Sequence, residues 1–334
     1  MILEDIYVKY YKVNEAFINI LVTEAIFEMG KVDYNFTEGV LMEQINFFGK
    51  NKKINTNSVV LSASRMTDMS RFYPNELIEE VEKRLNKGID INTLVLWSKH
   101  PKSLISGELY TYLLKLKKRN IQLYYQCTIT GMGGRVIGKY NKKGSIILEP
   151  NVPKPYEAIN DLNKVIDLLG NPLRIKLRID PIVRIKNKLT NEMFSNIVLV
   201  EEIMRETSKL GIKNYTFSFL ESGIHDKVDR RFSRCDWEII TPSLQEKEKV
   251  YNWFKEKGNK YNVNVEACCV TGLKESRCID GYLFNELHDL GKVTDLKEPR
   301  KRSLCACTNS IDIGGWPPKK CYSGCKYCYA NAEV

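Results

Sequence analysis

Segments typical of β-strands alternate with segments typical of helices along most of this chain, and this alternation restricts its fold more than any other feature. The strand candidates are short, apolar runs at residues 58–63, 93–98, 123–129, 174–179, 215–220, 263–267 and 308–313. The helix candidates lie between them, at about 75–86, 103–117, 155–169, 191–210, 244–257 and 278–290. Such alternation is typical of parallel strands with helices packed outside them. We therefore predict an α/β fold in the form of a partial parallel (β/α) barrel.

The first 56 residues do not continue this alternation. They contain two apolar-rich helical stretches, at about 15–29 and 36–48, and a polar run that begins at Gly49. We predict an N-terminal helical extension over residues 1–56, followed by the barrel over residues 57–334 with a cysteine-rich region at its C-terminal end.

Composition excludes several classes of protein. The chain has 334 residues, of which 43% are hydrophobic and 28% charged, as in a globular protein with a substantial core. No run of 18 apolar residues predicts a membrane span, and the N-terminus lacks the order of a signal peptide, so we expect a cytoplasmic protein. Ten cysteines in a long cytoplasmic chain indicate metal or redox chemistry rather than disulfides.

Three cysteines stand close together near the end of the chain. Cys321, Cys325 and Cys328 have the spacing C-x3-C-x2-C. Three such thiolates each bind one iron of a cubane cluster and leave the fourth iron without a protein ligand. An open metal position is a reaction site, because a small molecule coordinates there. We therefore predict a [4Fe-4S] cluster held by these three thiolates.

Polar side chains recur where the predicted strands end, which is the rim that carries the chemistry in α/β barrels. Gln126, Thr128 and Thr130 alternate along the third strand and should share one face of it. From the rim we select Arg65, Asp68, Lys99 and Glu221 as candidate catalytic residues. The other polar residues at the strand ends are Ser62, Ser64, Ser98, His100, Arg178, Asp180, Ser218 and Glu266.

Several segments carry a resemblance to known proteins. The C-x3-C-x2-C spacing, with Tyr327 directly before the last cysteine, resembles the signature of radical S-adenosylmethionine (SAM) enzymes. Residues 62–74, 95–101, 178–182, 277–281 and 305–331 together resemble the family called domain of unknown function 1848. That family is similar to radical SAM proteins and has its cluster cysteines at the C-terminus. The resemblance covers about residues 57–332.

The resemblance implies a radical SAM-like fold and chemistry. The open iron would bind the amino and carboxylate groups of SAM, and reductive cleavage would yield a 5′-deoxyadenosyl radical. In such enzymes the cysteine loop follows the first barrel strand, whereas here it follows the last candidate, at 308–313. If that segment lies beside residues 58–63, the chain is a circular permutation of the usual order.

The resemblance also implies roles for residues near the cluster. Tyr327 would contact the adenine of SAM, and Ser64, Arg65 and Asp68 would bind its polar groups. No Gly-Gly-Glu motif follows the neighbouring strand, although that motif usually holds the SAM amino group. The electron would come from a small donor protein such as flavodoxin or ferredoxin.

The net charge of +10 bears on the substrate. Together with the similarity of the terminal motif to spore photoproduct lyase, it favours nucleic-acid repair or modification. The charge is dispersed, however, and dispersed charge is more typical of a solvated surface. The basic stretch from Arg230 to Arg234 has the same two interpretations, a phosphate contact or an exposed loop. The lone histidines His100 and His225 are either proton donors or ordinary hydrogen-bonded residues.

A second set of cysteines precedes the terminal motif. Cys268, Cys278, Cys305 and Cys307 match the ligand number of a closed [4Fe-4S] cluster, and the same four thiolates suit a structural zinc ion or remain separate buried thiols. Cys269 is an alternative to Cys268. Cys127 lies on the opposite face of its strand from Gln126, so we expect it in the core.

Two other functions compete with the radical SAM hypothesis. One is a non-catalytic module, stabilised by zinc or an iron–sulfur cluster, that binds nucleic acid through its basic surface. The other is an iron–sulfur electron carrier that does not bind SAM.

Overall fold

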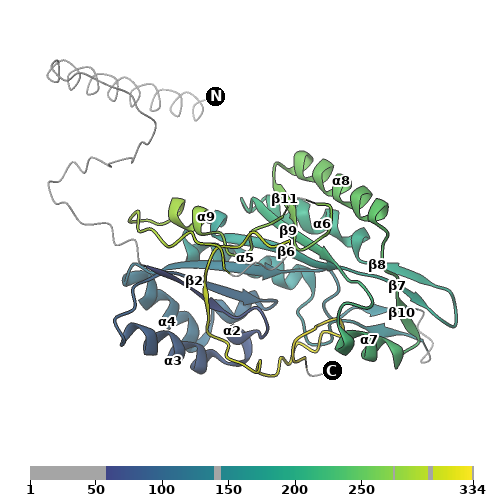
Figure 1. Cartoon of the computed structure of the whole chain (residues 1–334), viewed down its shortest axis with the longest axis horizontal. Coiled ribbons are helices and arrows are strands. Elements are labelled where there is room, and N and C mark those ends of the chain that lie inside the picture. The colour runs from purple at the N-terminus through teal and green to yellow at the C-terminus, as the bar shows by residue number, and fades with distance from the viewer. Residues whose placement is uncertain (1–57, 139–143, 274, 300–303, 333–334) are drawn as a thin grey trace, which may run out of the picture. The chain divides into compact units, whose positions relative to one another are not determined.

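The computed structural model of the chain describes residues 58–138, 144–273, 275–299 and 304–332 (Figure 1). The helical extension predicted over residues 1–56 lies outside the described residues and stays a prediction. None of the described helices is both long enough and apolar enough to span a membrane.

The core of the fold is a sheet of seven parallel strands in the order β11-β9-β6-β3-β2-β1-β12. The strands are β1 (Val59–Ala63), β2 (Ile91–Ser98), β3 (Gln122–Thr128), β6 (Ile175–Ile182), β9 (Asn214–Phe219), β11 (Asn264–Ala267) and β12 (Ile311–Asp312). Each of the seven predicted strand segments contributes one of them, which confirms the predicted α/β fold. In the described residues β11 and β12 form the two edges of the sheet, so the barrel is partial, as predicted.

The last strand in the sequence lies next to the first one in space. β12 pairs in parallel with β1, and Leu61 lies opposite Ile311 while Ser62 lies opposite Asp312. From β12 across to β11, the remaining strands follow in sequence order. The neighbour relation on which the permutation hypothesis depends is therefore confirmed.

Six helices correspond to the predicted ones. They are α3 (Pro74–Leu85), α4 (Gly107–Lys118), α5 (Pro155–Leu169), α6 (Ile197–Ser208), α8 (Leu244–Tyr261) and α9 (Gly281–Glu286). The sequence did not predict α2 (Met69–Phe72), α7 (Asp226–Ser233) or the short 3-10 helices at Pro101–Leu104 and Pro172–Arg174.

Three of the predicted helices began too early. The prediction for α4 began at residue 103, which lies in the separate 3-10 helix Pro101–Leu104. The prediction for α6 began at residue 191, but Met193–Ser195 form the strand β8, and the side chain of Asn196 binds three backbone groups before the helix begins. The prediction for α9 began at residue 278, but the carboxylate of Asp280 accepts from the amide of Leu283 and caps the helix at Gly281. Such a local side-chain cap competes with helix continuation.

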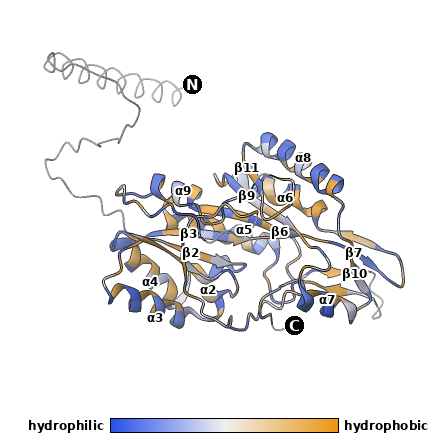
Figure 2. Ribbon diagram, viewed as in Figure 1, coloured by the Kyte–Doolittle hydropathy of each residue, from blue (hydrophilic) through white to orange (hydrophobic). Residues whose placement is uncertain are grey.

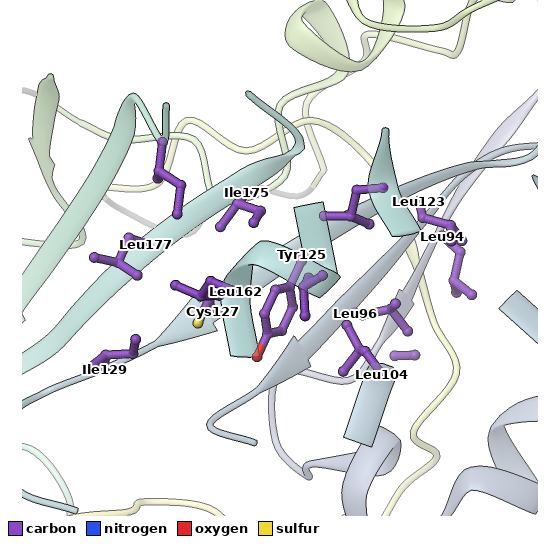
Figure 3. Packing of buried hydrophobic residues seen from close by; sticks show 14 of the residues in the cluster. Leu94, Leu96, Leu104, Leu123, Tyr125, Cys127, Ile129, Leu162, Ile175 and Leu177 are labelled. Carbon is purple, nitrogen blue, oxygen red and sulfur yellow. The ribbon is translucent and has the colours of Figure 1, made fainter. Parts of the chain in front are cut away.

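One face of the sheet is apolar and is covered by helices. Alternate residues of β2, β3 and β6 point to this face, and Figure 3 shows several of them packed together, with Cys127 among them as predicted. The helices α3, α4, α5, α6 and α8 contribute their apolar sides to the same core, whereas their hydrophilic sides face outward (Figure 2). Truncating one of these buried leucines to alanine would cost about 2–5 kcal/mol.

The opposite face of the central strands, here called the polar face, carries the residues of the other register. Its side chains are Ser62, Trp97, Gln126, Thr128, Lys176, Arg178, Asp180, Thr216 and Ser218. The segment around α9 lies against this face near the start of β3, where Gln122 donates to the carbonyl of Phe284 at 3.0 Å. Gln126 and Thr128 do share a face, as predicted from their spacing.

A second, smaller core lies beyond the main sheet. It is formed by the three-stranded sheet of β10 (Trp237–Ile239), β7 (Arg184–Asn187) and β8, and by the hairpin of β4 (Val136–Ile137) and β5 (Ile146–Ile147). Trp237 is buried there and donates its indole N–H to the carbonyl of Gly144 at 2.7 Å. Cys325 and Tyr327 pack into the same core, which fixes the end of the chain in place.

Candidate functional site

The terminal cysteine loop lies across the C-terminal ends of the strands. Figure 1 shows this segment, in yellow, running from the region of α9 past α2 to the region of α7. Residues that follow β1, β2 and β3 hold its backbone and side chains. The contacts are Thr67 to the carbonyl of Lys319 (3.0 Å), Tyr73 to the carbonyl of Lys320 (2.9 Å), His100 to Ser323 (3.0 Å) and Asn151 to the carbonyl of Tyr322 (2.8 Å).

The loop brings its three cysteines into one neighbourhood. Cys325 is buried, and Cys321 and Cys328 are half-buried. Burial raises the pKa of the Cys325 thiol well above its ordinary value, and the nearby thiols of Cys328 and Cys321 add to this rise. Gly324 has φ of +67°, a left-handed conformation that glycine adopts without strain, at the turn directly before Cys325. The three cysteines thus lie together on one short loop at the strand ends.

A buried carboxylate that the sequence did not reveal anchors this loop. Glu149, with 1% of its side chain exposed, accepts from Lys99 at 2.8 Å. Thr130 donates to its Oε2 at 2.8 Å, and the hydroxyl of Tyr327 donates to Oε1, the oxygen that Lys99 also binds. The sole hint in the sequence was one acid directly after the apolar run Ile146 to Leu148, with no motif around it.

Lys99, a predicted catalytic residue, lies between this carboxylate and the cysteine loop. Its Nζ is 5.6 Å from the ring centroid of Tyr327. Burial alone would lower the pKa of Lys99, but the negative charges of Glu149 and Cys325 outweigh burial and raise it. Lys99 therefore remains an ammonium, paired with Glu149.

The predicted adenine contact Tyr327 is 8% exposed. Its hydroxyl is bound to Glu149 and its ring packs in the second core. The structure therefore uses the hydroxyl to fix the loop, and the predicted contact with adenine stays a prediction for the ring and backbone.

Asp68 connects the first two strand ends. Its carboxylate accepts from Ser98 Oγ at 2.7 Å, from the amide of Lys99 at 3.1 Å and from the amide of Arg71 at 3.1 Å. Burial raises the pKa of Asp68 to about 6 in spite of these donors. Because its oxygens accept from protein donors, Asp68 links the segment after β1 to the end of β2.

Ser64 and Arg65 lie nearer the edge strand. Ser64 donates to Asp312 at 2.8 Å, which joins the end of β1 to β12. The guanidinium of Arg65 lies 5.6 Å from the ring centroid of Trp97, on the polar face. Ser64 thus contacts β12 and Arg65 contacts the polar face, and their contacts with SAM stay predictions.

Glu221, the fourth predicted catalytic residue, forms an ion pair with Lys247 of α8 at 2.6 Å. Its neighbour Leu220 packs in the same core as Cys325. The structure thus places Glu221 at the rim, as predicted, but partnered with a helix rather than with the cysteine loop.

The second set of cysteines gathers on the polar face. Cys278 and Cys307 are buried, Cys268 and Cys305 are half-buried, and all four pack in one cluster with Val60, Tyr124 and Phe284. The sulfurs of Cys268 and Cys278 lie 3.7 Å apart, and Arg178 donates to Cys278 Sγ at 2.8 Å. Hydrogen bonds from Cys268 and Cys307, aided by the charge of Arg178, hold the pKa of Cys278 well below its ordinary value.

No group of three or more His, Cys, Asp or Glu side chains converges on a single metal ion among the residues that the structure describes. A cubane cluster does not require such convergence, because each thiolate binds a different iron. The Cys269 sulfur lies 4.0 Å from that of Cys268, so it remains an alternative ligand.

The basic stretch after β9 has a structural role. Arg231 donates to the carbonyls of Lys326 (3.3 Å) and Cys328, and so holds the terminal loop from the side of α7. The nearby His225 stacks on Tyr329 with ring centroids 4.9 Å apart. The guanidinium of Arg231 is therefore engaged with this chain's own backbone.

Comparisons with known proteins give one family. The family described as "Domain of unknown function (DUF1848)" matches residues 60–330. No curated protein matches the chain.

Solved structures of SuiB from Streptococcus suis show a weak likeness. SuiB bound to the precursor peptide SuiA has a TM-score of 0.28 and 9% identity, over 78% of this chain and 62% of that one. SuiB bound to S-adenosylmethionine has a TM-score of 0.28 and 7% identity, over 70% of this chain and 53% of that one. The chain spans less than two thirds of these proteins, and at such TM-scores the likeness carries no argument.

Proposed function

The chain belongs to the family of domain of unknown function 1848, and we propose that it is a radical SAM enzyme whose [4Fe-4S] cluster is held by Cys321, Cys325 and Cys328. One observation carries this proposal. The C-x3-C-x2-C loop follows the edge strand β12 and lies across the C-terminal strand ends, where Cys325 is buried and Cys321 and Cys328 are half-buried.

The donor set fits a cluster with one open iron. Three thiolates serve three irons, and the nearest buried carboxylate, Glu149, is engaged by Lys99, Thr130 and Tyr327. Glu149 is therefore not free to act as a fourth ligand. Once bound, the cluster would supply one electron to SAM, whose cleavage yields a 5′-deoxyadenosyl radical that abstracts hydrogen from the substrate.

The chain's own residues position the loop and balance its charge. Lys99 places an ammonium near Cys325, Glu149 fixes Tyr327, and Arg231 holds the backbone of Cys328. Burial of Cys325 keeps water from the cluster side of the loop. Ser64 and Arg65 directly follow β1, the strand paired with β12, and are our candidates for the polar groups of SAM.

A small flavodoxin or ferredoxin is our proposed electron donor, because the cleavage of SAM needs a low-potential electron. For a nucleic-acid substrate, the net charge of +10 is the remaining support. The basic stretch from Arg230 to Arg234 gives less support, because its Arg231 binds a carbonyl of the terminal loop.

The test is reductive SAM cleavage by anaerobically purified protein. With dithionite and SAM, the wild type should release 5′-deoxyadenosine, and Cys325→Ala should reduce this release to background. Cys235→Ala is the matched control, since Cys235 is half-buried and belongs to neither cysteine set. Zinc in a colourless protein would instead indicate a binding module, and iron without SAM cleavage would indicate an electron carrier.

A further inference from the structure

Four cysteines outside the terminal loop come together on the polar face. Cys268 directly follows β11, Cys278 precedes α9, and Cys305 and Cys307 precede β12. Their sequence separation is large, yet they share one buried cluster with side chains of β1, β2 and β3. Residues from three separate segments therefore supply thiols to one place on the sheet.

Four thiols supply the donor set of a single zinc ion or of a closed cubane. Zinc–sulfur bonds of about 2.3 Å in a tetrahedron place the sulfurs about 3.8 Å apart. Cys268 and Cys278 match one such edge at 3.7 Å. In the described part of the chain, however, no three donors converge on one ion. A cubane spreads four thiolates over four irons, so its binding would draw the sulfurs of Cys268 and Cys278 farther apart, and the four gathered thiols supply its full donor set.

The surroundings suit the negative charge of a cluster. Cys307 is 3% exposed, and its sulfur accepts from the amides of Cys278 (3.2 Å) and Ile279 (3.4 Å). Arg178 donates to Cys278 Sγ at 2.8 Å. N–H groups directed at cluster sulfurs stabilise the reduced, more negative state, so they raise the reduction potential.

Arg178 is held firmly in this position. Its other arm donates to Asp180, which in turn accepts from Ser218. Its guanidinium lies 5.1 Å from the ring centroid of Trp97. A buried guanidinium needs anions on both arms, and Asp180 supplies one of them while the sulfur of Cys278 supplies the other.

We propose that Cys268, Cys278, Cys305 and Cys307 bind a second [4Fe-4S] cluster, closed by four thiolates, and that Arg178 raises its reduction potential through its contact with Cys278. With no open iron, this cluster transfers electrons and does not bind SAM. The proposal does not depend on the terminal cluster.

The first experiment measures iron and acid-labile sulfide in the anaerobically reconstituted full chain. The wild type should hold about eight irons, and the triple variant Cys321→Ala/Cys325→Ala/Cys328→Ala should keep about four. Cys278→Ser/Cys307→Ser should lose four irons and retain the other four. A triple variant that holds no iron, or one zinc instead, overturns the proposal. If it keeps four irons while the wild type fails to cleave SAM, the proposed function fails and the second cluster stands.

The second experiment measures the midpoint potential of the four-iron triple variant by EPR-monitored titration. Adding Arg178→Gln should lower the potential, and Arg178→Lys should restore part of it. Arg184→Gln is the matched control, because Arg184 forms a surface pair with Glu246 at 2.6 Å. An unchanged potential in Arg178→Gln would overturn the role of Arg178, and a purely structural role would change cluster occupancy without moving the potential.

Discussion

Lys99→Met tests the buried network that holds the terminal loop. The substitution removes the ammonium that pairs with Glu149 at 2.8 Å, where the side chains are 16% and 1% exposed. The carboxylate of Glu149 is then left buried without its cation. Breaking a pair in this way costs about 3–5 kcal/mol, because the remaining charge is desolvated and uncompensated. For a domain of this size, that corresponds to a fall in Tm of roughly 6–20 °C.

A double-mutant cycle separates the ion pair from general damage at the site. Lys99→Met/Glu149→Gln leaves no charge, and the glutamine oxygen still accepts from Tyr327, so the double variant should regain roughly 2–3 kcal/mol of the loss. Lys102→Met is the matched control, because Lys102 is exposed on the neighbouring 3-10 helix and should change stability by less than about 0.5 kcal/mol.

The assay is urea denaturation followed by circular dichroism at pH 7 under anaerobic conditions. The reasoning predicts a large loss for Lys99→Met, a partial recovery for the double variant and no effect for Lys102→Met. It is refuted if Lys99→Met is no less stable than Lys102→Met. It is also refuted if Lys99→Met/Glu149→Gln is no more stable than Lys99→Met alone.

Three further predictions concern the strand ends. Because burial raises the pKa of Asp68 to about 6 from 3.8, the folded chain retains a proton that the unfolded chain releases. The stabilising contribution of this group should fall by about 3 kcal/mol as the pH rises from 4 to 6, and Asp68→Asn should lose this dependence in urea denaturation. His100 has the opposite sign: burial lowers its pKa to about 4 from 6.5, so its contribution should fall by about 3 kcal/mol as the pH drops from 6.5 to 4, and His100→Gln should abolish that change. Gly314→Ala should cost about 1–3 kcal/mol in thermal denaturation, because a Cβ there would lie 2.3 Å from Ser64 Oγ; a loss below about 0.5 kcal/mol would argue against the close approach of β12 to β1.

The strands and their faces could be read from the sequence because both signals are local. Alternation along β3 separates Cys127, in the core, from Gln126, on the polar face, and a period of two residues suffices to show it. The pairing of β12 with β1 followed from the segment order and from the resemblance together, and the register confirms it.

The anchors of the terminal loop could not be predicted in the same way. Glu149 and Tyr327 are 178 positions apart, and no motif surrounds Glu149 that would have linked them. The sequence around Arg231 is typical of an exposed charged loop, but in the structure its guanidinium donates to the carbonyl of Cys328. Contacts of this kind depend on how α7 and the second core meet, which no local pattern encodes.

The second cysteine set shows the same limit at the level of geometry. Its four members could be named from the sequence, but their gathering could not. They come together because the chain between the edge strands β11 and β12 packs across the polar face. The contact from Arg178 to Cys278 links residues 100 positions apart. It is this contact, and not the spacing, that ties the site to the centre of the sheet.

The most direct test of the central claim is the EPR spectrum of the reduced Cys278→Ser/Cys307→Ser variant with and without SAM. If Cys321, Cys325 and Cys328 hold a cluster with one open iron, SAM should change the g-values, because it coordinates that iron. A spectrum that is identical in the presence of excess SAM would mean that no iron position is available, and it would contradict the account.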